Sequence, residues 1–144
     1  MKFNKLYENI FKGASADEVK SRKEKVFYID FKKIFNIDLK NPNDPNNDWS
    51  KLDGNGWSRL LSEQPQFVDK ADWSKLNGYN WTLLLIDQPQ FADKADWSKF
   101  NGDNWSLLLR KQPQFADKCD WSKLNGVDWD WLLRIQPQLE KYKK

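Results

Sequence analysis

Residues 96–119 read DWSKFNGDNWSLLLRKQPQFADKC, and closely similar sequences stand directly before and after them. The copies occupy residues 48–71, 72–95, 96–119 and 120–144, which gives a period of 24 residues. Every copy keeps Asp-Trp-Ser-Lys at its start, one Gly, a central Trp, a Leu-Leu pair and Gln-Pro-Gln. A fixed period of this length is typical of repeat architectures, in which each unit contacts its neighbours.

The first half of each unit predicts a short turn followed by a helix. Asp72 is a favourable N-cap for a turn that runs to Leu76. Asn77-Gly78 is expected to end this turn, with Gly78 in the left-handed conformation. Asn80 and its equivalents in the other copies are then expected to cap the following helix.

The second half of each unit has the spacing of one helical face. Four side chains follow the i, i+3, i+4, i+7 pattern: Trp81, Leu84, Leu85 and Gln88. Pro89 ends this helix, because a proline pushes the preceding residue out of the α region. The pattern leaves open whether the residues from Pro89 onward continue as one kinked helix or form a second short helix.

A single unit cannot fold alone. It holds only about half a dozen large apolar side chains, and their burial does not offset the entropy lost in ordering the whole unit. Neighbouring units must therefore stack. The sequence predicts an all-α, short-helix solenoid of four repeats over residues 48–144.

The N-terminal residues 1–40 are predicted to be a helical cap on this solenoid, followed by a connector rich in Pro and Asn over residues 41–47. An amphipathic helix is expected from five apolar positions: Phe3, Leu6, Tyr7, Ile10 and Phe11. Ser15 to Glu18 has the pattern of a capping box at the start of a second helix. Residues 26–29 are partly β-branched, so a short strand is an alternative there. A separate mini-domain of about 40 residues is disfavoured without disulfides or metals.

Composition argues against catalysis. The chain has no His and one Cys, so the commonest general base and metal ligand is missing. We therefore expect no enzyme activity, no metal site and no cofactor. No apolar run is long enough to span a membrane, and no signal peptide is recognisable, which predicts a cytoplasmic protein without a membrane partner.

Two resemblances rest on the repeat itself. Leu84-Leu85 and Gln88-Pro89-Gln90, with their equivalents over residues 48–144, resemble leucine-rich-variant repeats, which also run to about 24 residues. That likeness implies a solenoid of alternating α and 3-10 helices, although Trp73 and Trp81 depart from the family pattern. The chain is also similar to uncharacterised bacterial proteins with tandem DWSKLNG…QPQFADKC arrays, a likeness that implies no particular activity.

Positions that differ between copies are the candidate binding site. On the helix after the central Trp they fall opposite the predicted core side, at 100° per residue. We name them the variable face: Asn55, Arg59, Ser62, Glu63; Tyr79, Leu83, Ile86, Asp87; Asp103, Leu107, Arg110, Lys111; Val127, Trp131, Arg134 and Ile135. Ten of these are predicted to contact a partner: Tyr79, Leu83, Ile86, Leu107, Arg110, Lys111, Val127, Trp131, Arg134 and Ile135. The alternative is that the row Leu83, Leu107 and Trp131 packs on the flank of the adjacent unit.

Three functions follow from these observations. Aliphatic, aromatic and Arg side chains on one surface are typical of a protein-binding patch, so a protein partner is the first hypothesis. A second is a small inhibitor, from a phage or mobile element, that occludes a host enzyme. The third is nucleic-acid binding through the basic run Lys20, Arg22, Lys23 and Lys25. Against the third, residues 48–144 carry fourteen basic and fourteen acidic side chains.

Overall fold

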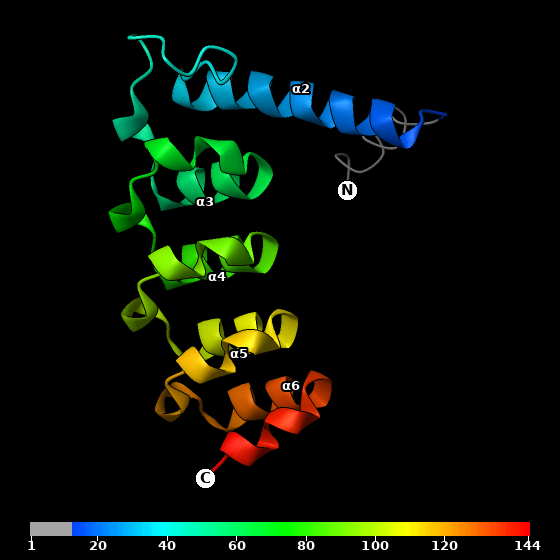
Figure 1. The fold of residues 1–144 in the computed structure, drawn as a ribbon, viewed down its shortest axis with the longest axis vertical. Coiled ribbons are helices and arrows are strands. Elements are labelled where there is room, and N and C mark those ends of the chain that lie inside the picture. The colour runs from blue at the N-terminus through cyan, green and yellow to red at the C-terminus, as the bar shows by residue number, and fades with distance from the viewer. Residues whose placement is uncertain (1–12) are drawn as a thin grey trace. The chain divides into compact units, whose positions relative to one another are not determined.

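The computed structural model describes residues 13–144, and every regular element within them is a helix (Figure 1). The amphipathic helix expected at Phe3 to Phe11 lies outside the described residues. By its internal contacts the chain divides into two compact units, Met1–Lys51 and Leu52–Lys144. None of the described helices is long and apolar enough to cross a membrane.

In the first unit, helix α2 spans Ala16–Phe35. It begins at the predicted capping box, in which the Glu18 N–H donates to Ser15 Oγ and the Ser15 N–H donates to the Glu18 carboxylate, both at 3.2 Å. The short strand considered for residues 26–29 is wrong, because these residues lie inside α2. Phe27 and Phe31, one turn apart, are both buried, so one helical face continues through the β-branched positions.

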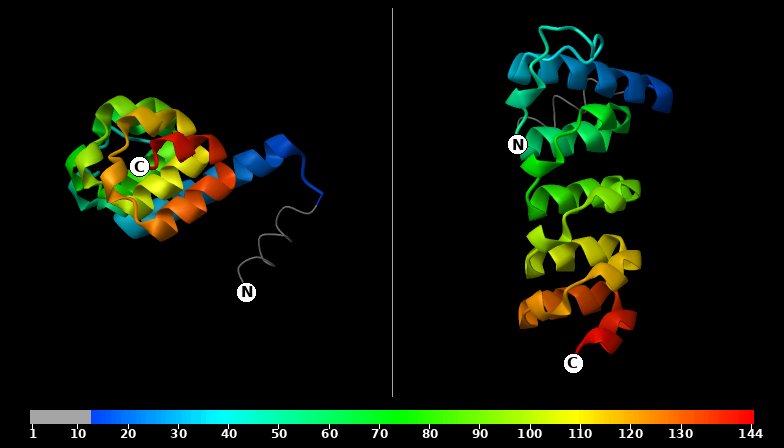
Figure 2. Two further views of the ribbon diagram at one scale, coloured as in Figure 1. Left: turned by 90° about the horizontal axis from the view of Figure 1, so that it is seen from below. Right: turned by 60° about the vertical axis from the view of Figure 1, so that its left-hand side comes forward.

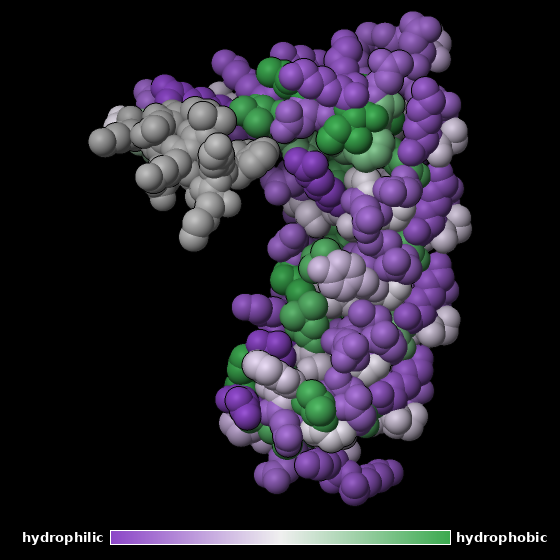
Figure 3. Space-filling model, turned by 180° about the vertical axis from the view of Figure 1, so that it is seen from behind, coloured by the Kyte–Doolittle hydropathy of each residue, from purple (hydrophilic) through white to green (hydrophobic). Residues whose placement is uncertain are grey.

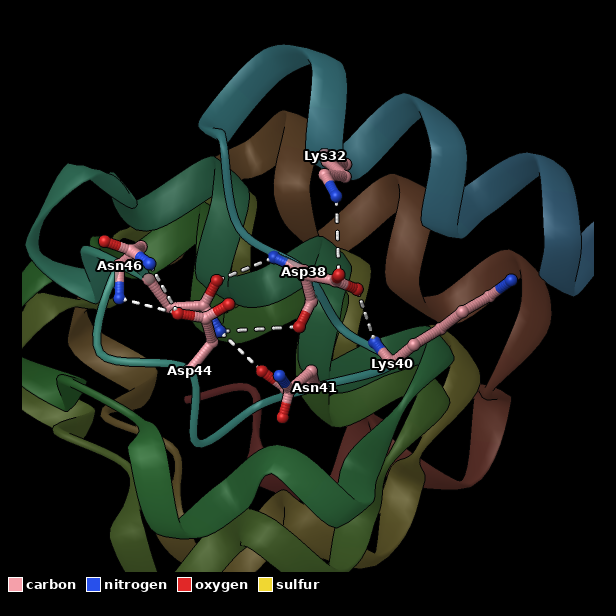
Figure 4. A network of polar contacts seen from close by, with 7 residues as sticks. Lys32, Asp38, Lys40, Asn41, Asp44 and Asn46 are labelled. Atoms are coloured by element: carbon pink, nitrogen blue, oxygen red, sulfur yellow. Dashed lines mark hydrogen bonds and ion pairs between the residues drawn. The ribbon is translucent and has the colours of Figure 1, made fainter.

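Consecutive turns follow α2, and polar side chains hold them together (Figure 4). The Asp38 carboxylate accepts from the Lys40 N–H at 3.0 Å and pairs with the Lys32 ammonium at 3.3 Å. Both contacts favour the charged form, and together they lower the pKa of Asp38. Asn47 Nδ2 donates to the Asn41 carbonyl at 2.9 Å. Trp49–Lys51, a 3-10 turn labelled η1, ends the unit.

The second unit is a solenoid in which one α-helix and two 3-10 helices recur. Its α-helices are α3 (Gly54–Glu63), α4 (Gly78–Asp87), α5 (Gly102–Lys111) and α6 (Gly126–Ile135). The 3-10 helices are η2 (Pro65–Lys70), η3 (Trp73–Lys75), η4 (Pro89–Lys94), η5 (Trp97–Lys99), η6 (Pro113–Lys118), η7 (Trp121–Lys123) and η8 (Pro137–Tyr142). Successive α-helices pack on one another in a stack (Figures 1 and 2). The residues after Pro89 thus form a separate 3-10 helix and not a kinked continuation of α4.

The helix caps differ from the predicted ones. Asn77, not Asn80, is the N-cap of α4; its side chain accepts from the Asn80 N–H at 2.8 Å. Asn80 completes a capping box by accepting from the Asn77 N–H at 3.1 Å. Gly78 is the first helical residue and has no positive φ. A Cβ at Gly78 would collide with the Lys99 carbonyl of the next repeat, so this glycine permits close stacking of the repeats.

Trp and Leu side chains form the core, as the helical spacing predicts. Trp81, Leu84 and Leu85 are fully buried, and so are their equivalents in the repeats on either side. The first Trp of a repeat is half-buried and stacks on the central one; the Trp73 and Trp81 ring centroids are 5.2 Å apart. The half-buried Trp of each such pair therefore covers the buried Trp and shields it from solvent.

In the second, third and fourth repeats, a lysine side chain bonds to the backbone of the preceding repeat. Lys99 Nζ donates to the Leu76 carbonyl at 2.8 Å, and Lys123 Nζ donates to the Phe100 carbonyl at the same distance. The equivalent bond from Lys75 reaches the Leu52 carbonyl, also at 2.8 Å. These charge-assisted bonds give the Lys after Trp-Ser a structural role in the last three copies.

Candidate functional site

The variable face lies on the outer side of helices α3 to α6. The N-cap side chains and the buried Trp-Leu side set the rotation of each helix, and this rotation turns the variable positions outward. Tyr79, Val127, Trp131 and Ile135 are large apolar or aromatic side chains that remain about half exposed or more. One side of the molecule carries separate hydrophobic patches within a mostly hydrophilic surface (Figure 3).

The row formed by Leu83, Leu107 and Trp131 is not uniform. Leu83 and Leu107 are half-buried, whereas Trp131 is 51% exposed. Among the other predicted contact residues, Ile86 and Arg110 are half-buried. The remaining ones are exposed: Tyr79, Lys111, Val127, Arg134 and Ile135. The flank of the neighbouring helix therefore covers part of the row and leaves its C-terminal end open.

A glutamine ladder fixes the backbone of this face. In the second, third and fourth repeats, the first Gln of the Gln-Pro-Gln motif donates from Nε2 to a carbonyl on the α-helix of the preceding repeat. The pairs are Gln88 with Ser62 at 2.8 Å, Gln112 with Ile86 at 2.8 Å, and Gln136 with Arg110 at 3.0 Å. Ser62, Ile86 and Arg110 all belong to the variable face. The invariant Gln thus bonds to the backbone of residues whose side chains vary between copies.

Trp131 is the centre of a cationic cluster. The Arg110 and Arg134 guanidinium carbons each lie 5.5 Å from the centroid of the Trp131 ring. This distance is within the range of cation–π attraction. Arg110 Nε is buried and has no acceptor among the described residues. All three residues are among the predicted contact residues, but the sequence does not predict that they contact one another.

A shallow groove lies beside this cluster, between α5 and α6. Its volume is about 250 Å³. The lining residues are Asp103, Ser106, Leu107, Arg110, Val127, Asp128 and Trp131. A second groove of about 290 Å³ lies between α3 and α4 and is lined by Asn55, Ser58, Arg59, Ser62, Glu63, Leu83 and Asp87. The variable face is therefore hollowed where adjacent helices meet.

Two carboxyl groups meet at the first of these grooves. Burial raises the pKa of Asp128, and the neighbouring Asp103 carboxyl raises it further, although the Asn125 N–H donates to Asp128 and opposes the shift. The same contact between α3 and α4 joins two amides: Asn80 Nδ2 donates to Asn55 Oδ1 at 2.7 Å. Asp128 was not among the predicted site residues.

The last repeat carries a larger hollow that the sequence did not indicate. Its volume is about 860 Å³, and its walls include Cys119, Trp121, Trp129, Lys141 and Tyr142. The Tyr142 ring stacks on Trp121 at 4.5 Å between centroids. Burial raises the pKa of Cys119 to about 12, so its thiol stays protonated and unreactive at neutral pH.

The basic run on α2 belongs to the other unit. Its four side chains are exposed: Lys20, Arg22, Lys23 and Lys25. Arg22 and Lys23 already have contacts within the protein. The described residues contain no cluster of acidic, Cys or His side chains that could hold a metal ion.

Comparison with known proteins gives no family for this chain. No protein-family model matches it, and it matches neither a curated protein nor a solved structure. The class of protein that the fold defines is a helical repeat protein built from α and 3-10 helices.

Proposed function

We propose that this protein is a non-enzymatic binding module that holds a protein partner on the variable face. The observation that carries the proposal is that each repeat contains two sets of positions, one that builds the stack and one that faces outward and varies. Invariant Trp, Leu, Lys and Gln side chains build the stack, whereas the outward positions change from copy to copy. A rigid scaffold that presents variable side chains on one surface is how solenoids bind their ligands.

The side chains on that face support a protein partner. Exposed Tyr79 and Trp131, together with Arg110 and Arg134, are of the residue types that dominate the binding energy of protein interfaces. Exposed apolar side chains gathered on one surface also favour association with another protein. The alternation of α and 3-10 helices supports the resemblance to leucine-rich-variant repeats. A cytoplasmic location, and an inhibitory role in which this face occludes a host enzyme, stay predictions.

Affinity capture with the full chain as bait tests the proposal. The wild-type protein should retain a host protein, and a variant with Leu83→Ser, Leu107→Ser and Trp131→Ser should lose it. Interface residues of this kind cost about 2 kcal/mol or more each when truncated, so the three together should weaken binding by roughly a thousandfold even without full additivity. Circular dichroism of the variant shows whether the fold survives, which matters because Leu83 and Leu107 are half-buried.

A matched charge variant separates protein binding from nucleic-acid binding. Lys20→Glu, Arg22→Glu, Lys23→Glu and Lys25→Glu should leave protein capture unchanged. A salt-sensitive gel shift with DNA or RNA that this variant loses, and no captured protein, would contradict the proposal. An activity assay on the captured protein then distinguishes an inhibitor from a scaffold.

A further inference from the structure

The two halves of the variable face differ in charge. The variable positions of the first two repeats hold one cation and two carboxylates. Those of the last two repeats hold three cations, Arg110, Lys111 and Arg134, and one carboxylate, Asp103. The variable positions on α5 and α6, taken apart from the other residues of these helices, are therefore suited to a partner with acidic side chains.

Arg110 and Arg134 have no anionic partner within the described part of the chain. Neither takes part in an ion pair there, and both lie against the Trp131 ring. A guanidinium that lies over an aromatic ring still has terminal N–H groups that can donate to a planar acceptor. A carboxylate matches these groups with two parallel hydrogen bonds.

The size of the groove between α5 and α6 defines what can enter it. Its volume of about 250 Å³ is below the roughly 300–1,000 Å³ of small-molecule sites, so it suits one side chain of a larger ligand. Leu107, Val127 and Trp131 give it apolar walls. Ser106, Arg110 and two carboxyl groups, Asp103 and Asp128, complete the lining, and the carboxyl groups disfavour an anion in the interior. An apolar side chain therefore fits inside, with carboxylates at the rim.

We infer that the partner contributes an acidic peptide segment, which places one large apolar side chain between α5 and α6 and carboxylates on Arg110 and Arg134. This inference rests on the proposed protein-binding function and adds the chemistry of the ligand. A nucleic acid fits less well, because its phosphates recur at every nucleotide and some of them would face the Asp103 carboxylate that lines the groove. A peptide can restrict its charges to the two cations.

A displayed library of random twelve-residue peptides, selected on the full-length protein, reads out this chemistry. Enriched peptides should carry Asp or Glu beside a large apolar residue. A synthetic copy of an enriched peptide should bind the Arg110→Gln/Arg134→Gln variant about tenfold more weakly or worse, since two charge-assisted contacts are lost. The control Lys94→Gln/Lys118→Gln removes the same charge from exposed sites away from the groove and should bind like wild type. The single exposed change Arg134→Gln gives the test a variant that does not disturb the half-buried Arg110.

Three results overturn the inference. The first is enrichment of peptides that lack acidic residues. In that case the proposed protein-binding function still stands if Trp131→Ser abolishes binding of those peptides. Equal loss of binding in the arginine and lysine variants would show attraction by net charge alone. The third is a selection that enriches no peptide, whether or not the protein binds a single-stranded oligonucleotide of mixed sequence. Failure of the proposed function is a separate result, namely that affinity capture retains no host protein.

Discussion

Two glycines at the same position of neighbouring repeats should respond in opposite ways to alanine. Gly102 and Gly126 are each the first residue of an α-helix, and neither has a positive φ. A Cβ at Gly102 would collide with the Lys123 carbonyl and the Asp128 carboxylate of the next repeat. A Cβ at Gly126 meets nothing within 4 Å.

The magnitudes follow from these surroundings. Gly126→Ala should raise the free energy of unfolding by about 0.4–1 kcal/mol, because alanine lowers the entropy of the unfolded chain at no steric cost. Gly102→Ala should lower it by about 1–3 kcal/mol, since α5 and α6 must move apart to admit the methyl group. Urea unfolding of the two full-length variants beside wild type, followed by circular dichroism, measures both changes. Equal changes of the same sign would refute the stacking of the repeats through this glycine.

Three further predictions concern the core, the glutamine ladder and the carboxyl pair. Leu108→Ala should cost about 2–5 kcal/mol of unfolding free energy, and the half-buried Leu107 should cost clearly less when changed to Ala; equal losses in thermal or urea unfolding would mean that the helix is rotated differently. Gln112→Ala should lower the free energy of unfolding by about 1–3 kcal/mol in the same assay, because the Ile86 carbonyl is left without its donor; an unchanged stability would show that the glutamine ladder does not stabilise the stack. Asp128→Asn should become more stable than wild type as the pH rises. The pKa of Asp128 is raised in the fold, so its stabilising contribution is complete below its ordinary pKa and is lost as the pH rises through the folded pKa; parallel stability–pH curves of the two proteins would contradict this.

The sequence predicts the repeat, its helical class and the buried side of each helix, because periodic apolar residues report burial directly. Leu107 and Leu108 illustrate this, since adjacent residues differ in burial as the 100° rotation requires. The cap positions were harder to predict. Asn77 and Asn80 are both good capping residues, three positions apart. Only the hydrogen bonds show that Asn77 is the N-cap and that Asn80 completes the capping box.

Local preference also misled the prediction at residues 26–29. Val26 and Ile29 are β-branched and favour strands, but Phe27 and Phe31 bury one face of a helix that began at Ser15. Packing of that face outweighs the small intrinsic cost of β-branched residues in a helix. The alternative of a strand was drawn from four residues, whereas the helix that contains them is 20 residues long.

The candidate site shows a similar limit. Its outward positions could be named because they vary between copies, but their mutual contacts join residues about one repeat apart. Asp103 and Asp128 meet across α5 and α6, and Arg110 reaches the ring of Trp131. Such contacts depend on the rise and rotation from one repeat to the next, which a single sequence does not encode in any local pattern.

Hydroxyl-radical footprinting of the complex with the captured partner shows whether the variable face is the binding surface, because it reports the accessibility of individual side chains. If the variable face binds the partner, oxidation of Tyr79, Leu107 and Trp131 should fall in the complex, while Trp121 and Tyr142 at the last repeat should react as in the free protein. Protection of Trp121 and Tyr142 with unchanged oxidation of Trp131 would contradict binding on the variable face, since the partner would then be bound elsewhere.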